Sequence, residues 1–111
     1  MPWRIELTEA SRKDFDGLDG SVKPIVLKAL KKVAENPLPL QEGGYGKPLG
    51  NKGGNDLSGF YKIKLRKQGI RVVYGLKRTQ STMTVVVISL RSDNQVYDLA
   101  EQRIKDSHSF G

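Results

Sequence analysis

The feature that most constrains this chain is a stretch of 36 residues, Leu57 to Ser92, that contains no Asp or Glu. It carries eight Lys and Arg residues, whereas the other 75 residues hold 11 basic and 12 acidic side chains. The formal net charge of +7 is therefore concentrated in one part of the 111-residue chain. A concentrated positive field attracts phosphate, so the sequence favours a nucleic-acid partner over a generally lysine-rich surface.

Within this stretch, residues 61–66 alternate in the way that predicts a strand with one basic face. Period-2 alternation places Tyr61, Ile63 and Leu65 on the core side. The opposite side then holds three cations: Lys62, Lys64 and Arg66. These recur roughly every 6.6 Å, from a rise of about 3.3 Å per residue, which is close to the spacing of phosphates along a nucleic-acid strand.

A tight turn at Lys67-Gln68-Gly69 is expected to lead into a second strand, because Gly69 supplies a positive φ. In that strand Arg71 joins the basic face. The core face takes Ile70, Val72 and Tyr74. The sequence therefore predicts a hairpin with four convergent cations.

Length and composition indicate one domain over residues 1–111 that folds without disulfides. A chain of this size buries on the order of 65% of its unfolded surface. The chain has no Cys, which excludes disulfides and thiolate metal ligands. No apolar run approaches the roughly 20 residues of a membrane span, and the N-terminus alternates where an export signal would be apolar. We expect a cytoplasmic location.

A strand and two helices are expected ahead of the basic stretch. Alternation in residues 3–8 predicts the strand. One helix is expected over Glu9–Asp19, capped by Thr8 and closed by Gly20. A second is expected from Ser21 to the Asn36-Pro37 stop, with an apolar stripe on one side. Together they form a helical hairpin.

Residues 37–59 lack periodicity and hold seven of the twelve glycines, which favours one long loop at the rim of the basic face. The segment Gly43–Pro48 lacks the spacing of a phosphate-binding loop and a helix directly behind it, so nucleotide binding is not expected. Tyr45 and Lys47 are candidates for contact with a partner.

The C-terminal third predicts a strand and a helix. Residues 82–90 are rich in β-branched side chains and contain a nearly continuous apolar run through Ile88, as in a central strand buried on both faces. Asp93 or Ser92 is expected to cap the last helix. One side of that helix holds Val96, Leu99, Ala100, Arg103 and Ile104, which fall at i, i+3, i+4, i+7 and i+8. Residues 107–111, with the single histidine, His108, are expected to form a polar tail.

Several segments together resemble the RelE family of bacterial toxins. They are Phe60–Arg66, Gly69–Tyr74, Val87–Ser89, and Arg91 followed six residues later by Tyr97. Lys47–Gly50 is similar to the family's segment before the hairpin. The resemblance implies an α+β fold of the microbial-ribonuclease kind, with two helices on one side of an antiparallel sheet of about four strands and a C-terminal helix.

The same resemblance implies a toxin that cuts messenger RNA in the ribosomal A site, inhibits translation and is paired with an antitoxin. Lys62 corresponds to the general base for the 2′-hydroxyl, and Tyr97 to the residue that orients or stacks the nucleotide. Lys64 and Arg71 correspond to the groups that hold the scissile phosphate. Arg91 corresponds to the group near the leaving 5′-oxygen. Further RNA contacts are expected from Arg66, Lys67 and Lys47.

The chemistry of the residues agrees with this assignment. Attack by the RNA's own 2′-oxygen needs a base, charge stabilisation and an acid, but neither a protein nucleophile nor a metal. No metal or cofactor is therefore expected. Lys62 is suited to be a base because the cations beside it disfavour its charged form.

Two other functions stay open from the sequence. A ParE-like toxin, which inhibits DNA gyrase by protein contact, uses the same scaffold without needing the cationic set. A non-catalytic RNA-binding module needs only a basic face. Tyr97 also has a purely structural interpretation, in which it packs on the sheet at the start of the last helix. The expected partners are messenger RNA on the ribosome, ribosomal RNA and an acidic antitoxin segment.

Overall fold

A computed structural model of the chain describes residues 2–52 and 54–106. Its described elements begin with β1 (Arg4–Leu7), α1 (Glu9–Asp16), α2 (Lys23–Ala34) and the short 3-10 helix η1 (Leu40–Glu42). They continue with β2 (Lys47–Lys52), β3 (Asn55–Leu65), β4 (Ile70–Lys77), the short 3-10 helix η2 (Arg78–Gln80), β5 (Thr82–Ser89) and α3 (Asp93–Asp106). The expected tail at 107–111, including His108, lies outside the described residues.

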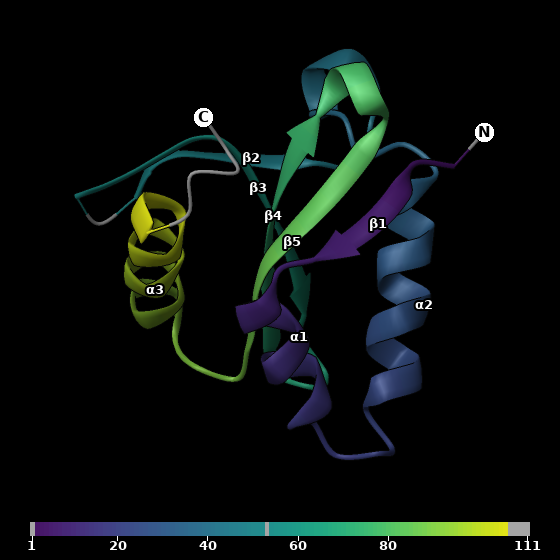
Figure 1. Cartoon of the computed structure of the whole chain (residues 1–111), viewed down its shortest axis with the longest axis vertical. Coiled ribbons are helices and arrows are strands. Elements are labelled where there is room, and N and C mark those ends of the chain that lie inside the picture. The colour runs from purple at the N-terminus through teal and green to yellow at the C-terminus, as the bar shows by residue number, and fades with distance from the viewer. Residues whose placement is uncertain (1, 53, 107–111) are drawn as a thin grey trace.

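The strands form one five-stranded sheet in the order β1-β5-β4-β3-β2. The four strands from β2 to β5 are antiparallel, as expected, whereas β1 joins the sheet parallel to β5. Helices α1 and α2 cover one face of the sheet, and α3 covers part of the other (Figure 1). The α+β prediction is confirmed. No helix in the described part of the chain is long and apolar enough to cross a membrane.

Two apolar clusters hold these layers together. The cluster under α1 and α2 includes Tyr61 and Tyr74, whose ring centroids lie 5.5 Å apart. The cluster under α3 combines sheet residues with three buried residues of that helix: Val96, Tyr97 and Ala100. Because both faces are covered, β5 is buried from Thr82 to Ile88. The prediction of a central strand buried on both sides is confirmed.

The first helices keep their expected order but not their expected ends. Thr8 caps α1 as predicted, since its side chain accepts a hydrogen bond from the Ser11 N–H. The helix ends at Asp16 and not at Asp19, because Gly17 closes it with bonds to the preceding turn. The Asp19 carbonyl then accepts from two backbone N–H groups in the turn that starts α2. This turn delays the second helix to Lys23.

The prediction of one long loop over residues 37–59 is wrong. The segment contains η1, the edge strand β2 and the first five residues of β3. Pro48 is tolerated because β2 lies at the sheet edge, where an N–H is not needed on the outer side. Gly44 is required for packing, because a Cβ there would lie 2.0 Å from the Leu38 carbonyl oxygen. Gly46 is restricted in the same way by the Pro37 carbonyl oxygen, whereas Gly43, Gly50, Gly54 and Gly59 have open space around them and adopt a positive φ.

β5 contains a bulge where it pairs with β4. Val73 and Tyr74 of β4 pair with Val87 and Val85, so Val86 is the extra residue. Val86 and Val87 consequently both pack in the cluster under α3. The bulge thus interrupts the alternation of β5, so that two consecutive side chains face α3 near the end of the strand.

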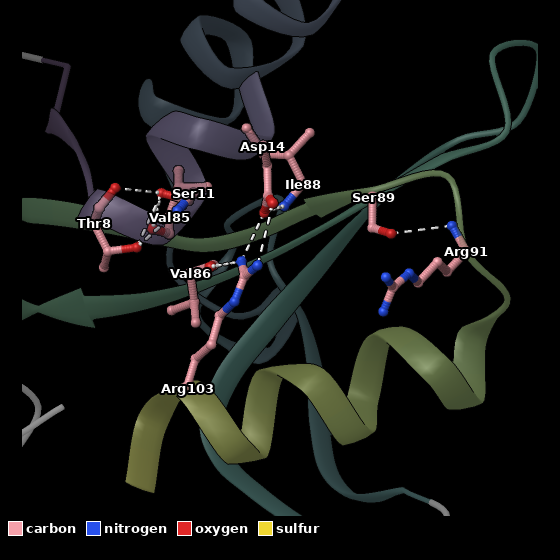
Figure 2. Close-up of polar contacts among 9 residues, drawn as sticks. All are labelled: Thr8, Ser11, Asp14, Val85, Val86, Ile88, Ser89, Arg91 and Arg103. Atoms are coloured by element: carbon pink, nitrogen blue, oxygen red, sulfur yellow. Dashed lines mark hydrogen bonds and ion pairs between the residues drawn. The ribbon is translucent and has the colours of Figure 1, made fainter. Parts of the chain in front are cut away.

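Side chains from α1 and α3 bond the backbone of β5 beyond its pairing with β1 (Figure 2). The Ser11 hydroxyl donates to the Val85 carbonyl at 2.8 Å. Asp14 accepts from the Ile88 N–H at 3.1 Å and from both Nη atoms of Arg103, and Arg103 also donates to the Val86 carbonyl. These bonds tie the two helices to the same strand and fix where α3 lies.

Candidate active site

The predicted hairpin of β3 and β4 forms, with its turn at residues 66–69 and Gly69 at a φ of +68°. Lys64 lies directly opposite Arg71, and Lys62 lies opposite Val73. Residues opposite each other in an antiparallel pair share a face. Since Val73 packs under α3, the three cations lie on the face that α3 partly covers. The predicted core side of the hairpin is also confirmed, because Tyr61, Ile70, Val72 and Tyr74 pack under α1 and α2.

The cations and the last helix meet around a small hollow that is too narrow here to admit a water molecule. Its polar lining consists of Lys62, Lys64, Arg71, Asp93 and Tyr97. Ile63, Val72 and Val73 of the sheet also line it, and of these only Val73 has its side chain on the α3 face. The hollow therefore joins four residues predicted from sequence with one carboxylate that the sequence interpretation had placed elsewhere.

Tyr97 takes part in both the core and the hollow. Its side chain is only 6% exposed and packs in the cluster under α3, yet it lines the hollow beside the cations. Burial, with a contribution from the Asp93 charge, raises the pKa of the Tyr97 phenol, and Arg71 opposes this shift. The phenol is consequently a neutral hydroxyl at physiological pH, able to donate a hydrogen bond.

Asp93 is the functional candidate that sequence reasoning missed. It is the first residue of α3, but its carboxylate contacts the cations: Arg71 Nε donates to Oδ1, and Lys64 Nζ lies 3.4 Å from Oδ2. Burial disfavours the charged carboxylate, but hydrogen bonds and charges from Arg71 and Lys64 outweigh it and lower the pKa of Asp93. Expected only as a helix cap, Asp93 instead supplies a counter-charge. The sequence held one signal for this role of Asp93, which is its position one helical turn before Tyr97.

Arg91 reaches the site through its main chain. The Arg71 Nη1 donates to the Arg91 carbonyl at 2.9 Å, and the Arg91 N–H donates to the Ser89 hydroxyl at 3.1 Å. Its side chain is exposed, and in Figure 2 it points back between the end of β5 and the first turn of α3. The connection that carries Arg91 is thus held against the hairpin, with its guanidinium available to a ligand.

The remaining predicted RNA contacts extend the basic face on two sides. Lys47 of β2 lies opposite Lys62 and is exposed. Arg66 and Lys67 are exposed in the hairpin turn, where Arg66 lines a second hollow with Lys64 and Arg71. The predicted RNA contacts therefore lie on two sides of the first hollow, on the edge strand and at the hairpin turn.

Comparisons with known proteins place the chain in a family. A RelE-like toxin protein of Escherichia coli is 31% identical over 106 residues, which cover 95% of this chain and all of that relative. This chain belongs to the RelE toxin family. The mRNA interferase toxin RelE of E. coli K12 is 28% identical to this RelE-family chain over 107 residues, covering 94% of it and 99% of that relative. No family model matches.

Solved structures agree with this family assignment. A substituted form of E. coli RelE in the free state has a TM-score of 0.67 and 27% identity, with 94% of this chain and 99% of that chain covered. The same substituted toxin in complex with a peptide of the antitoxin RelB also has a TM-score of 0.67, at 26% identity, with 90% and 95% covered. The RelE-like fold expected from the hairpin motif is confirmed.

Proposed function

We propose that this chain is the toxin of a toxin–antitoxin pair and cuts messenger RNA in the ribosomal A site, which inhibits translation. One observation carries the proposal: Lys62, Lys64, Arg71 and Tyr97 line a single hollow on a RelE fold. Relatives that the chain covers almost completely bear the name mRNA interferase RelE. Gyrase inhibition and plain RNA binding do not require these four side chains together.

The proposed reaction is an internal transesterification. The 2′-oxygen of the nucleotide attacks the adjacent phosphorus, and the bond to the 5′-oxygen breaks. Lys62 takes the 2′-hydroxyl proton, while Lys64 and Arg71 stabilise the charge that grows on the phosphoryl oxygens. Arg91 stabilises the leaving 5′-oxygen by its charge, and solvent water supplies the proton that this oxygen gains, because a guanidinium holds its protons too tightly to be an effective acid. Tyr97 orients the nucleotide through its neutral hydroxyl.

The basic surface around the hollow sets the path of the RNA in this proposal. Lys47 lies beside Lys62 on one side, and Arg66 and Lys67 lie at the turn on the other. These three residues contact the phosphates that flank the scissile one. Because such contacts release counter-ions, binding weakens as the salt concentration rises.

The proposed partners follow from the same surface. Solved RelE structures contain the antitoxin RelB or a RelB peptide, so we propose a cognate antitoxin for this chain. An acidic antitoxin segment complements the basic face of the hairpin and competes with RNA for it. Messenger RNA on the ribosome and ribosomal RNA are the proposed nucleic-acid partners, which implies a cytoplasmic location.

Primer extension on messenger RNA bound to purified bacterial ribosomes tests the proposal. We expect new 5′ ends at the A-site codon with the wild-type protein, and none with Lys62→Ala or Arg71→Ala. Lys28→Ala, which removes an exposed cation from α2 on the other side of the sheet, is the matched control and should cut normally. No cleavage by folded wild-type protein would refute the endonuclease and favour gyrase inhibition or plain RNA binding.

A further inference from the structure

Asp93 has no role in the reaction proposed above, yet it lies at the centre of its cationic site. One carboxylate oxygen contacts Arg71 and the other Lys64, the two residues proposed to hold the scissile phosphate. The three side chains are only partly exposed, at 25% for Arg71, 31% for Lys64 and 40% for Asp93. A carboxylate in this position repels a phosphodiester, so its presence needs an explanation beyond charge balance.

The explanation lies in how Arg71 is held. A guanidinium has five N–H groups in one plane. Asp93 accepts from Nε and the Arg91 carbonyl accepts from Nη1, so two bonds from one connection fix the orientation of that plane. Three N–H groups, those of Nη2 and the second of Nη1, remain for a phosphate. Without Asp93, rotation about the Cδ–Nε bond would be restrained only through Nη1.

Asp93 also fixes the position of Tyr97 relative to Arg71. The two α3 residues are four positions apart, which places them on the same side of the helix, and both line the hollow. The contact between Asp93 and Arg71 therefore aligns the start of α3, and with it Tyr97, against the hairpin. A single carboxylate thus sets the mutual placement of groups on two elements.

We propose that Asp93 is a positioning residue, which holds Arg71 in the orientation required at the scissile phosphate and weakens RNA binding in doing so. The inference rests on the proposed function. The proposed role predicts that removal of the carboxylate tightens RNA binding and at the same time slows the chemical step. A residue needed only for folding would weaken both, and a simple competing counter-ion would slow neither.

The test compares Asp93→Asn and Asp93→Ala with the wild type. Binding is measured on an RNA with a 2′-deoxy substitution at the scissile nucleotide, and chemistry as the single-turnover rate on ribosome-bound messenger RNA at saturating protein. We expect both variants to bind the RNA several-fold more tightly, because each removes one negative charge. We expect the rate to fall roughly tenfold in Asp93→Ala, and less in Asp93→Asn, which retains one acceptor oxygen. Asp106→Asn removes the same charge from the exposed end of α3 and should change neither rate nor affinity.

The NMR signal of the Arg71 Nε–H gives a readout that needs no cleavage. Hydrogen exchange at this N–H should be slow in the wild type and fast in Asp93→Ala, with the other signals unchanged. If the wild type does not cut RNA, the proposed function fails, and an unchanged exchange rate would separately refute the contact. Tighter binding with an undiminished rate would overturn positioning, as would a parallel loss of binding and rate.

Discussion

The ion pair between Asp14 and Arg103 should be the polar contact most important for the placement of α3. Arg103 Nη1 and Nη2 donate to the two carboxylate oxygens at 2.6 and 3.1 Å, and Nη1 also donates to the Val86 carbonyl at 2.9 Å. The two side chains are only 21% and 19% exposed. The informative perturbation is Arg103→Met, which keeps most of the apolar stem and removes all three bonds.

The expected loss follows from what remains after the substitution. Asp14 would keep its bond from the Ile88 N–H at 3.1 Å but would lose its counter-charge, and the Val86 carbonyl would lose its Arg103 donor. Loss of one partner of a fully buried pair costs about 3–5 kcal/mol. Because about a fifth of each side chain remains in water, we reduce this to about 2–3 kcal/mol of unfolding free energy.

Urea unfolding followed by far-UV circular dichroism measures this loss. The expected result is a lower midpoint with an unchanged slope, since the surface exposed on unfolding stays the same. Lys105→Met is the matched control, because its salt bridge to Glu101 on the same helix involves a lysine side chain that is 72% exposed. The free energy of unfolding of this control should fall by less than about 0.5 kcal/mol. A loss equally small for Arg103→Met would refute the reasoning and leave the apolar cluster alone to hold α3.

Three further predictions concern the site, the packing of a glycine and a titration. Lys62→Ala should lose most RNA cleavage while binding to ribosomes survives, and unchanged cleavage would remove Lys62 from the mechanism. Gly44→Ala should lower the free energy of unfolding by about 2 kcal/mol or more, because the new Cβ would collide with the Leu38 carbonyl. The matched control is Gly20→Ala, whose Cβ meets nothing within 4 Å. Equal unfolding midpoints for the two variants would contradict this prediction. The lowered pKa of Asp93 means that its contribution to stability is complete above the pKa of the unfolded chain, about 3.9, and disappears as the pH falls through the lower folded value. An NMR titration of the Asp93 carboxyl carbon with a midpoint at or above 3.9 would contradict it.

The local parts of the fold and site were predictable from sequence because they depend on periodicity. Alternation placed the hairpin cations on one side and its core residues on the other, and the structure confirms both arrangements. The helical stripe placed Val96 and Ala100 on the buried side of α3 in the same way. The packing of Tyr97 on the sheet is confirmed, because this residue lies in the cluster under α3, whereas its contact with the nucleotide stays a prediction.

The features that sequence could not predict depend on contacts between distant residues. β2 was missed because Pro48 and the glycines disfavour a strand locally, and only pairing with β3 stabilises it. The parallel pairing of β1 with β5, and the bond from Arg103 to Asp14 across 89 residues, depend on the completed topology. Asp93 fitted a helix cap equally well, and only its contact with Arg71 reveals its other role.

The hairpin of β3 and β4 brings two like charges close together. Lys64 and Arg71 are directly opposite on neighbouring strands, an arrangement in which like charges repel and destabilise the sheet. The stretch from Leu57 to Ser92 offers no acid to relieve this repulsion, and the first acidic residue beyond it is Asp93, which folds back onto both cations. Relief therefore comes from α3, the element that also carries Tyr97 into the hollow. A carboxylate within the hairpin would have relieved the repulsion whether or not α3 was docked. Because the carboxylate belongs to α3, the repulsion between Lys64 and Arg71 is relieved only when α3 is docked and Tyr97 lines the hollow.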